Sequence, residues 1–370
     1  METRNNAGGR TNINANGAST ANTRTNINAN GVNGNGVNGN GVNGNGGVNG
    51  NGGVNGNGKN LLIKMEKVVK RYGNVLALDH FDFGLNKGEI VGLLGPNGSG
   101  KTTAINCILS LLKYDSGTIE VFGQRMRPDA YDLKRKIGVV PQEIAVFPSL
   151  TVWENVDYFC GLYIADKNQR RICVDEAIEF TGLEDYHKRP AGKLSGGLRR
   201  RLNVACGIAH RPELLFLDEP TVAVDAQSRN FMLEGFRSLN EQGTSIVYTS
   251  HYLEEVDFLC DRIIIMDQGR NLAAGTSAEL KDMISLSERI QLTVPQPPED
   301  FSDMLHRLPN LASIEESQDG YELRFDGGRH NLSNVLELLK AENIPYEKLF
   351  GEQPTLNDVF LELTGKELRD

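Results

Sequence analysis

The glycine-rich segment GPNGSGKTT, residues 95–103, restricts the choice of fold more than any other part of this sequence. It follows the apolar run IVGLL and precedes KTTAINCILSLL, so we expect a strand, a loop and a helix in succession. In that context the pattern G-x-x-x-x-G-K-[ST] wraps main-chain N–H groups around a phosphate. Lys101 supplies a charge for the outer phosphates, and the Thr102 hydroxyl suits Mg²⁺. The segment therefore predicts a nucleotide site.

Short, nearly all-apolar runs recur along the chain and alternate with helical patterns. KIGVVPQE at 136–143, ELLFLDEP at 213–220 and SIVYTSH at 245–251 each end in polar residues. This alternation predicts an α/β fold with a parallel sheet buried on both faces. Ligands gather at the carboxyl ends of the strands in such sheets. The polar residues expected there are Gln142, Asp218, Glu219 and His251.

Each of these polar residues has a chemical role that fits a bound nucleotide. Asp218 can hold Mg²⁺ through water, and Glu219 can orient or deprotonate the attacking water. His251 can donate to the γ-phosphate, and Tyr72 can stack on an adenine face. Taken singly, an Asp-Glu pair is often part of a solvated loop, and a lone His or Tyr is more often structural. The phosphate loop in the same sheet is what favours the functional interpretation.

A second segment, KLSGGLRRRLNVACGI at 193–208, also predicts an anion site. Ser195 is a good N-cap, and the apolar residues that follow it fall on one helix face. The exposed N–H groups of a helix start attract anions. The run Arg199–Arg201 places cations in the first turns of a helix, where they oppose the helix dipole. Two interpretations stay open: the three side chains lie on a solvated helix face, or a nearby anion offsets this unfavourable interaction.

Charge and cysteine content exclude several classes of protein. The net charge is −9, and residues 1–58 contain three Arg and one Glu, which leaves −11 for the rest of the chain. An acidic body argues against nucleic acid as a partner, because phosphate contacts need clustered Lys and Arg. The five cysteines are scattered without a C-x-x-C pair, as expected for reduced thiols in the cytosol. No apolar run approaches the roughly 18 residues that span a bilayer, and no signal peptide is evident.

Composition divides the chain into three regions. Residues 1–59 repeat TNINANG and GVNGN units and lack apolar surface, so we expect a disordered Asn/Gly-rich tail. Residues 60–285 form the α/β unit, with an inserted helical lobe at about 143–190. Residues 286–370 show a β-α-β-β-α-β order, which predicts an accessory α+β domain of ferredoxin-like arrangement, closed by the helical segment TLNDVFLELTG.

Three apolar residues of the expected helical lobe have two open interpretations. They are Phe147, Leu150 and Trp153. The first interpretation places them in the core of the lobe. The second has some of them lining a groove that receives a helix of a membrane partner.

The order and spacing of several motifs resemble the ATP-binding subunit of ABC transporters. The matching elements are Tyr72, GPNGSGKTT, Gln142, LSGG, LLFLDEP, VDAQSR and His251, over about residues 61–285. The resemblance implies a P-loop NTPase fold, with antiparallel β and helical subdomains, that binds and hydrolyses ATP with Mg²⁺. It implies catalytic roles for Glu219, His251 and Gln142. The residues that it implies for ATP are Tyr72, Gly95, Pro96, Asn97, Gly98, Ser99, Gly100, Lys101, Thr102 and Thr103, and those for Mg²⁺ are Thr102, Gln142 and Asp218.

The resemblance also explains the second anion site. In this family, the counterpart of LSGG caps ATP that the opposite subunit holds, which implies a role in trans for Ser195, Gly196, Gly197 and Asp225. The implied partners are a second ATP-binding subunit, with a homodimer favoured, and an integral membrane permease that Gln142 senses. The chain would then lie at the cytoplasmic face of the membrane.

Within the family, the chain looks like the ABC-2 branch, which exports drugs, polymers and lipids. The C-terminal PTLNDVFLELTG and the segment GTSAELK carry this resemblance. Ala223 and Ala226 depart from the commoner Gly and Pro, which affects communication between subunits rather than hydrolysis. Leu198 replaces a common Gln, as is usual in this branch.

Two other functions stay open at this stage. A soluble ABC ATPase acting on a macromolecular partner would predict two cassettes or a long coiled coil with a basic surface, and the sequence has none of these. A regulatory module would use the C-terminal domain to bind a small ligand.

Overall fold

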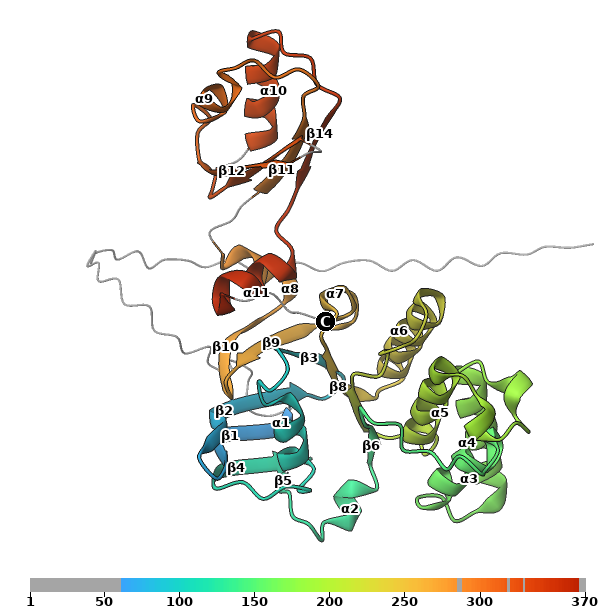
Figure 1. The fold of residues 1–370 in the computed structure, drawn as a ribbon. Coiled ribbons are helices and arrows are strands. Elements are labelled where there is room, and N and C mark those ends of the chain that lie inside the picture. Colours follow the sequence, from blue (N-terminus) through green and yellow to red (C-terminus); the bar gives the residue numbers. More distant parts are fainter. Residues whose placement is uncertain (1–60, 285–287, 318–319, 329, 366–370) are drawn as a thin grey trace, which may run out of the picture. The chain divides into compact units, whose positions relative to one another are not determined.

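The computed structural model describes residues 61–284, 288–317, 320–328 and 330–365. The expected Asn/Gly-rich tail, residues 1–59, lies outside the described residues. Three sheets and their helices make up the described part (Figure 1).

The main sheet has six strands in the order β10-β9-β3-β8-β7-β6. β3 (Ile90–Leu94) pairs in parallel with β8 and β9, and β7 pairs in parallel with β6 and β8. The prediction of a parallel sheet is confirmed, with β10 as an antiparallel edge strand. Every residue of β3, β7 and β8 is buried, as the apolar runs indicate. The other strands are β6 (Ile137–Val140), β7 (Leu214–Asp218), β8 (Ser245–Ser250), β9 (Arg262–Asp267) and β10 (Arg270–Gly275).

A second sheet is antiparallel and has the order β2-β1-β4-β5. Its strands are β1 (Leu61–Tyr72), β2 (Val75–Asn86), β4 (Ser116–Val121) and β5 (Gln124–Arg125). The helix α1 (Lys101–Ile108) buries its apolar residues in one core with side chains of this sheet and of β3. α1 is shorter than the expected 101–112, because Ser110 adopts φ 53° and leaves the helical conformation.

Three helices form a lobe beside the main sheet (Figure 1). α3 (Val152–Gly161) begins with a capping box between Thr151 and Glu154, and Asp166 caps α4 (Lys167–Phe180). α5 (Gly196–Ile208) begins at the predicted N-cap, because the Ser195 side chain accepts from the Leu198 N–H at 3.3 Å. Within the expected lobe, the helical patterns TVWENVDYFCGLY (151–163) and RRICVDEAIEFTGL (170–183) therefore do form helices. α3 is shorter than the first pattern at both ends, whereas α4 begins and ends three residues before the second.

The three apolar residues of the lobe separate into two environments. Trp153 packs against the lobe core, and Leu150 is half-buried. Phe147 is 42% exposed, contacts Tyr158 edge-to-face and stacks on Phe159. The core interpretation is thus confirmed for Trp153 and wrong for Phe147.

Three of the remaining helices of this region, α6, α7 and α8, follow strands of the main sheet, and α2 connects β5 to β6. Short 3-10 turns span Glu184–Tyr186 and Ala191–Lys193. At Gly92 of β3, an added Cβ would lie 2.8 Å from Cγ1 of Val256, so α7 packs directly on the central strand. The helices are α2 (Tyr131–Lys134), α6 (Ala226–Glu241), α7 (Leu253–Leu259) and α8 (Ser277–Asp282).

The C-terminal region contains a third, antiparallel sheet in the order β12-β13-β11-β14. Two helices share a separate apolar core with it. The predicted alternation of strands and helices is present. α9 is shorter than the helical pattern EDFSDMLHRL (299–308), and β14 begins and ends two residues after the strand pattern YEKLF (346–350). The elements are β11 (Glu288–Thr293), α9 (Phe301–Leu305), β12 (Leu311–Ser317), β13 (Gly320–Phe325), α10 (Asn331–Ala341) and β14 (Lys348–Glu352).

The last helix, α11 (Leu356–Thr364), does not belong to the core of the third sheet. Leu356, Val359 and Phe360 are buried in the core that includes Val256 of α7 and Leu280 of α8. On its other side, Asp358 pairs with Arg289 of β11. α11 therefore ties the C-terminal sheet to the helices that follow the main sheet.

Candidate nucleotide-binding and hydrolysis site

The glycine-rich loop between β3 and α1 is packed too tightly for side chains at two positions. A Cβ at Gly95 would lie 2.3 Å from the Met266 carbonyl oxygen. Gly100 has φ +111°, and a Cβ there would lie 2.6 Å from the Ala77 carbonyl oxygen. Glycine is required at both positions, so the main chain itself forms the wall of the loop.

The loop residues fit a phosphate group. Main-chain N–H groups in the first turn of α1 have no partner within the helix, and Gly100 at the N-cap has no side chain with which to cap them. The buried Ser99 hydroxyl has no hydrogen-bond partner among the described residues. The Lys101 ammonium is buried and donates to the carbonyls of Gly95 at 2.7 Å and Pro96 at 3.2 Å. Together these groups offer an anion several donors and one positive charge.

Burial lowers the pKa of Lys101, and the nearby carboxylates of Glu219 and Asp218 partly offset that effect. Two carboxylates therefore lie close enough to the ammonium to favour its charged form. A bound polyphosphate would further favour the charged form of the lysine.

Oxygen atoms that suit Mg²⁺ meet at the end of β7. The Thr102 hydroxyl donates to Oδ2 of Asp218 at 3.1 Å. The Thr249 hydroxyl donates to Oδ1 of the same carboxylate at 2.6 Å. A hydroxyl and a carboxylate next to a phosphate loop form a fitting donor set for Mg²⁺, which prefers oxygen ligands.

Glu219 is held in an uncommon backbone conformation. Its φ is 48°, in the left-handed region that costs non-glycine residues about 1 kcal/mol or more. The surrounding structure fixes it, because the Glu219 N–H donates to the main-chain oxygen and to the hydroxyl of Thr249, each at 3.1 Å. The Glu219 carboxylate lies close enough to Lys101 for its negative charge to raise the pKa of that ammonium.

Two further predicted residues contact the Glu219 carboxylate. The Gln142 side-chain amide donates to Oε2 at 2.9 Å. Nδ1 of His251 lies 3.7 Å from Oε1, an ion pair when the histidine is protonated. The structure thus brings Gln142, Glu219 and His251 together from three different strand ends.

The loop that bears Gln142 is fastened to α5. Arg200 donates to the carbonyls of Pro141 and Gln142, and Asn203 donates to the Pro141 carbonyl at 3.1 Å. The Asn203 side-chain oxygen accepts the Ala145 N–H at 3.0 Å. Burial lowers the pKa of Arg200, and Glu219 and Asp218 counteract this. The solvated-face interpretation is therefore wrong for Arg200, whereas Arg199 is exposed as that interpretation expects.

Tyr72 lies at the end of β1 with its side chain half exposed. The ammonium of Lys70 lies 5.2 Å from the centroid of its ring. A half-exposed aromatic ring keeps apolar surface free for stacking on a planar ligand.

The residues expected to act in trans form a separate group. The Asp225 carboxylate caps α6 by accepting the Ser228 N–H at 2.9 Å, and this hydrogen bonding lowers the pKa of Asp225. A Cβ at Gly197 would lie 3.5 Å from the Ala223 oxygen, so the start of α5 adjoins the segment before α6. In the described ranges, the side-chain hydrogen bonds of Ser195 and Asp225 cap their own helices and do not reach residues 95–103.

Sequence reasoning missed Thr249 and Asn203, and it named Arg200 only as part of a run with two open interpretations. Thr249 has a local signal, because it is the second-last residue of the buried strand β8, two residues before His251. Arg200 and Asn203 have none, since their partners lie 58 to 62 residues away.

Comparison with known proteins agrees with this geometry. The family model for the ABC transporter matches residues 78–222. The chain is 39% identical to the linearmycin resistance ATP-binding protein LnrL of Bacillus subtilis (strain 168), over 84% of this chain and 100% of that protein. It is 36% identical to the daunorubicin resistance ATP-binding protein DrrA2 of Streptomyces coeruleorubidus, over 82% and 95% of the two chains. It is 33% identical to the Nod factor export ATP-binding protein I of Burkholderia orbicola (strain AU 1054), over 83% and 98%.

Solved structures match the α/β part of the chain. The ATP-binding cassette MJ0796, in a dimeric post-hydrolysis state bound to ADP and Pi, is 28% identical with a TM-score of 0.54. That match covers 58% of this chain and 98% of the cassette. The cbiO1 protein from Clostridium perfringens, part of the ABC transporter complex cbiONQ, is 26% identical with a TM-score of 0.55 and covers 60% and 91%.

The described helices include none with the length and hydropathy needed to cross a bilayer. Relatives above 30% identity match along nearly their whole length, and the site contains the phosphate loop, the strand-end acids and the capped second helix. This chain belongs to the ATP-binding proteins of ABC transporters and is an ABC transporter ATPase.

Proposed function

We propose that this chain is the ATP-hydrolysing subunit of an exporter, that it dimerises around ATP, and that it powers a separate integral membrane permease. Three relatives are named for linearmycin resistance, daunorubicin resistance and Nod factor export, which supports an export role. The dimeric MJ0796 cassette supports dimerisation, and the cbiONQ complex supports a membrane partner. The chain would then lie at the cytoplasmic face of the membrane through its permease.

Residues 95–103 bind the phosphates of ATP in this proposal. Lys101 leaves the loop carbonyls of Gly95 and Pro96 and turns to the outer phosphates. The buried Ser99 hydroxyl and the N–H groups of the first turn of α1 provide further donors. Tyr72 stacks on the adenine ring.

Thr102, Asp218 and Gln142 hold Mg²⁺. The ion neutralises charge on the phosphates when it is bound. Thr249 keeps the Asp218 carboxylate in place, since its hydroxyl already occupies Oδ1 and leaves Oδ2 on the Thr102 side.

Glu219 acts on the attacking water. It orients the water and takes up its proton as the water oxygen bonds to the γ-phosphorus and the bond from that phosphorus to the ADP oxygen breaks. His251 donates to the γ-phosphate from the other side of the carboxylate. The observation that supports this most directly is the pair of contacts at the Glu219 carboxylate, with Gln142 at 2.9 Å from Oε2 and His251 at 3.7 Å from Oε1.

Ser195, Gly196, Gly197 and Asp225 act on the ATP of the opposite subunit. Their position at the start of α5 and beside the start of α6, on segments separate from residues 95–103, supports this assignment. Helix starts attract anions, and the two glycines leave open space or ordinary contact distances around the main chain.

We propose the domain boundaries 60–285 for the cassette, with its helical lobe at about 143–190, and 286–370 for the accessory domain. A ferredoxin-like arrangement of that domain is supported by its antiparallel strand order, in which the first strand, β11, lies between the last, β14, and the third, β13. The separate apolar core of these strands and of α9 and α10 supports the division up to β14, whereas α11 packs into the core that includes α7 and α8.

The test is reconstitution. The purified chain should hydrolyse ATP only with Mg²⁺, and its turnover should rise when it is combined in proteoliposomes with its permease, which is to be sought among the products of neighbouring genes. A chain without Mg²⁺-dependent hydrolysis would contradict the ATPase mechanism. Hydrolysis that no membrane protein alters would contradict the transport role.

A further inference from the structure

A second buried carboxylate lies behind the hydrolysis site, on the helix that follows His251. Glu255 of α7 is only 3% exposed. Removing a carboxylate from water is costly unless hydrogen bonds and a counter-charge replace the lost hydration. The partners of Glu255 should therefore show what this residue holds in place.

Three hydroxyl groups surround the Glu255 carboxylate. Oε2 accepts from the Tyr248 hydroxyl at 2.7 Å and from the Ser250 hydroxyl at 2.8 Å. Oε1 accepts from the Thr221 hydroxyl at 2.8 Å. Tyr248 and Ser250 belong to β8, the strand that leads to His251, whereas Thr221 lies two residues after Glu219. One carboxylate thus joins the two segments that bear the proposed catalytic residues.

The turn around His251 is part of the same network. The Ser250 hydroxyl donates to Glu255 and accepts the Tyr252 N–H at 2.9 Å. These two bonds fix the main chain on both sides of His251. The imidazole is therefore placed by its neighbours, and its distance of 3.7 Å from Glu219 depends on them.

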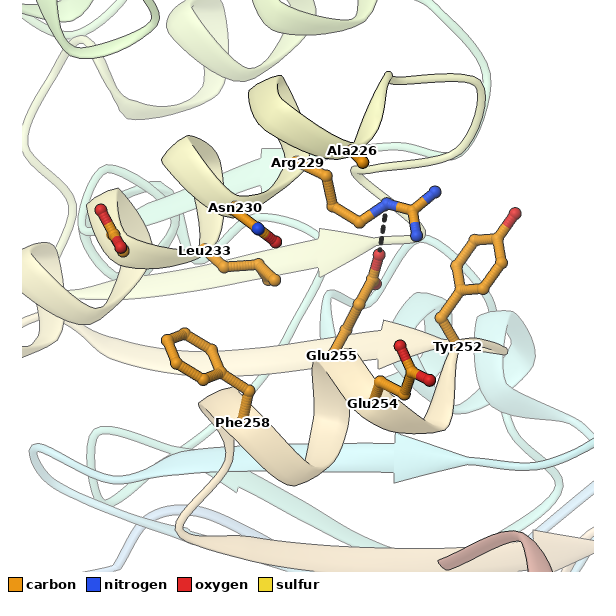
Figure 2. Close-up of a pocket in the computed structure, with 9 residues that line it drawn as sticks. Ala226, Arg229, Asn230, Leu233, Tyr252, Glu254, Glu255 and Phe258 are labelled. Atoms are coloured by element: carbon orange, nitrogen blue, oxygen red, sulfur yellow. Dashed lines mark ion pairs between the residues drawn. The ribbon is translucent and has the colours of Figure 1, made fainter. Parts of the chain in front are cut away.

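The counter-charge comes from a third segment. Nε of Arg229 on α6 lies 3.3 Å from Oε1 of Glu255, and Figure 2 shows the two side chains directed toward one another. The guanidinium also lies 4.5 Å from the centroid of the Tyr252 ring. Together with Leu233 and Phe258, these residues line a cavity of about 440 Å³ between α6 and α7.

Arg229 connects this network to the proposed trans site. The main-chain N–H of Arg229 donates to the main-chain carbonyl of Asp225 at 2.8 Å, in the first turn of α6. A shift at the start of α6 would therefore move Arg229, and Arg229 would pull on Glu255. The route consists of direct contacts at each step, from Asp225 through Arg229 and Glu255 to the turn of His251.

We propose that Glu255 is a positioning residue for hydrolysis, which sets His251 against Glu219 and links both to the start of α6 through Arg229. This inference rests on the proposed roles of Glu219 and His251. Replacing the Glu255 carboxylate with an amide removes the counter-charge of Arg229. It also turns one of the two acceptor oxygens into an NH2 donor, so the three hydroxyls lose part of their shared acceptor. ATP binding at residues 95–103 involves none of these groups and should persist.

The main experiment compares Glu255→Gln with Glu254→Gln, the exposed neighbour on the same helix. We expect Glu255→Gln to lower kcat for ATP about 10²-fold, because catalytic groups tolerate little misplacement. The KM and the equilibrium Kd for ATP should stay within about threefold of wild type, as expected for a loss restricted to the transition state. A kcat for Glu255→Gln equal to that of Glu254→Gln would overturn the proposal, as would equal losses in binding and turnover.

A second pair of variants, at Thr221, tests the positioning role of Glu255 if Glu255→Gln does not fold. Thr221→Val removes the hydroxyl and keeps the shape, whereas Thr221→Ser keeps the hydroxyl. We expect kcat to fall in the Val variant and to be retained in the Ser variant, at unchanged Kd. Equal kcat in the two would overturn the proposal.

The proposed function fails by a different result. If wild type lacks Mg²⁺-dependent hydrolysis, or if Glu219→Gln hydrolyses as fast as wild type, the ATPase mechanism itself is contradicted. If wild type is active and Glu219→Gln is not, the Glu255 and Thr221 variants test the positioning role alone.

Discussion

The Gln142 side-chain amide donates to the Glu219 carboxylate at 2.9 Å, although the two residues lie 77 positions apart in the chain. They follow β6 and β7, which are parallel neighbours in the main sheet. Gln142 contacts Oε2, and His251 approaches Oε1 from β8. The carboxylate is thus oriented from both sides, which fits a group that must direct one water molecule.

Replacing Glu219 with Gln should separate binding from hydrolysis. Glu219→Gln keeps the size of the side chain and leaves Lys101, Thr102 and Asp218 in place, so ATP binding should persist. Loss of a general base typically costs about 10²–10⁴ in rate. Steady-state ATPase and equilibrium ATP binding measure the two effects.

A control for that substitution is available next to the same strand. Glu213 precedes β7 at its opposite end and pairs with Lys136 at the surface. Glu213→Gln should hydrolyse ATP at the wild-type rate. An unchanged rate in Glu219→Gln would exclude Glu219 as the base.

The trans role of Ser195 can be tested in mixed dimers. One protomer has Lys101→Ala, which removes the charge on the outer phosphates, and its partner has Ser195→Arg, which obstructs the start of α5. Each homodimer should lack a competent site. In the mixed dimer, one composite site combines both lesions and the other has none, so one intact site is restored.

The readout of the mixed dimer is trapped nucleotide, with Glu219→Gln in both chains to block hydrolysis. We expect about one ATP per dimer, the count that independent composite sites require. If the start of α5 acted within its own subunit, both protomers would stay defective. No trapped ATP in the mixed dimer would therefore rule out action in trans.

The hydroxyl of Thr249 should matter for the Mg²⁺ dependence. It lies 2.6 Å from Oδ1 of Asp218, so Thr249→Val leaves a buried carboxylate oxygen without its donor. We expect a stability loss of about 1–3 kcal/mol and a higher Mg²⁺ concentration for half-maximal activity. Thr249→Ser retains the hydroxyl and should restore the Mg²⁺ dependence. Identical Mg²⁺ titrations for Val and Ser would show that the contact is irrelevant.

Arg200 should hold the loop that bears Gln142. Arg200→Ala removes a buried guanidinium that donates to two carbonyls of that loop. Hydrogen bonds from charged donors contribute about 1.5–3 kcal/mol, so we expect a loss of that order in the free energy of unfolding and faster amide exchange at residues 142–145. The exposed Arg199 is the matched control. Equal exchange in Arg199→Ala and Arg200→Ala would refute the role.

His210 should make stability depend on pH. Its Nε2 lies 3.1 Å from the Ile137 carbonyl oxygen, its ring stacks on Tyr163 with centroids 3.8 Å apart, and burial lowers its pKa to about 4 from 6.5. Between pH 6.5 and 4 the unfolded chain binds more protons than the folded one, so stability falls as the pH falls through this window. The loss is on the order of 2–3 kcal/mol by pH 4.

His210→Gln keeps a donor for Ile137 but does not titrate. Urea unfolding at pH 5 and pH 7 should show a smaller difference for this variant than for wild type. The same difference in both proteins would assign the pH effect to other groups.

Local sequence patterns determined much of this protein. The spacing of glycines, Lys101 and Thr102 predicts the phosphate loop, and the structure shows why glycine is needed at Gly95 and Gly100. The Ser195 cap and the alternation of apolar strands with helices were likewise predicted and confirmed. These features depend on residues within a few positions of one another, where helix and strand periods and turn geometry act directly.

Tertiary structure decided what those local elements contact. The strand order places Thr249 beside Asp218, 31 positions away, and buries Arg200 against the Gln142 loop in a run that also suits a solvated face. The apolar face of α11 predicts burial but not that it packs on α7 and α8. No short-range pattern encodes these choices, because strand order, helix packing and burial of a charge depend on partners distant in the chain, and only the folded arrangement brings those partners together.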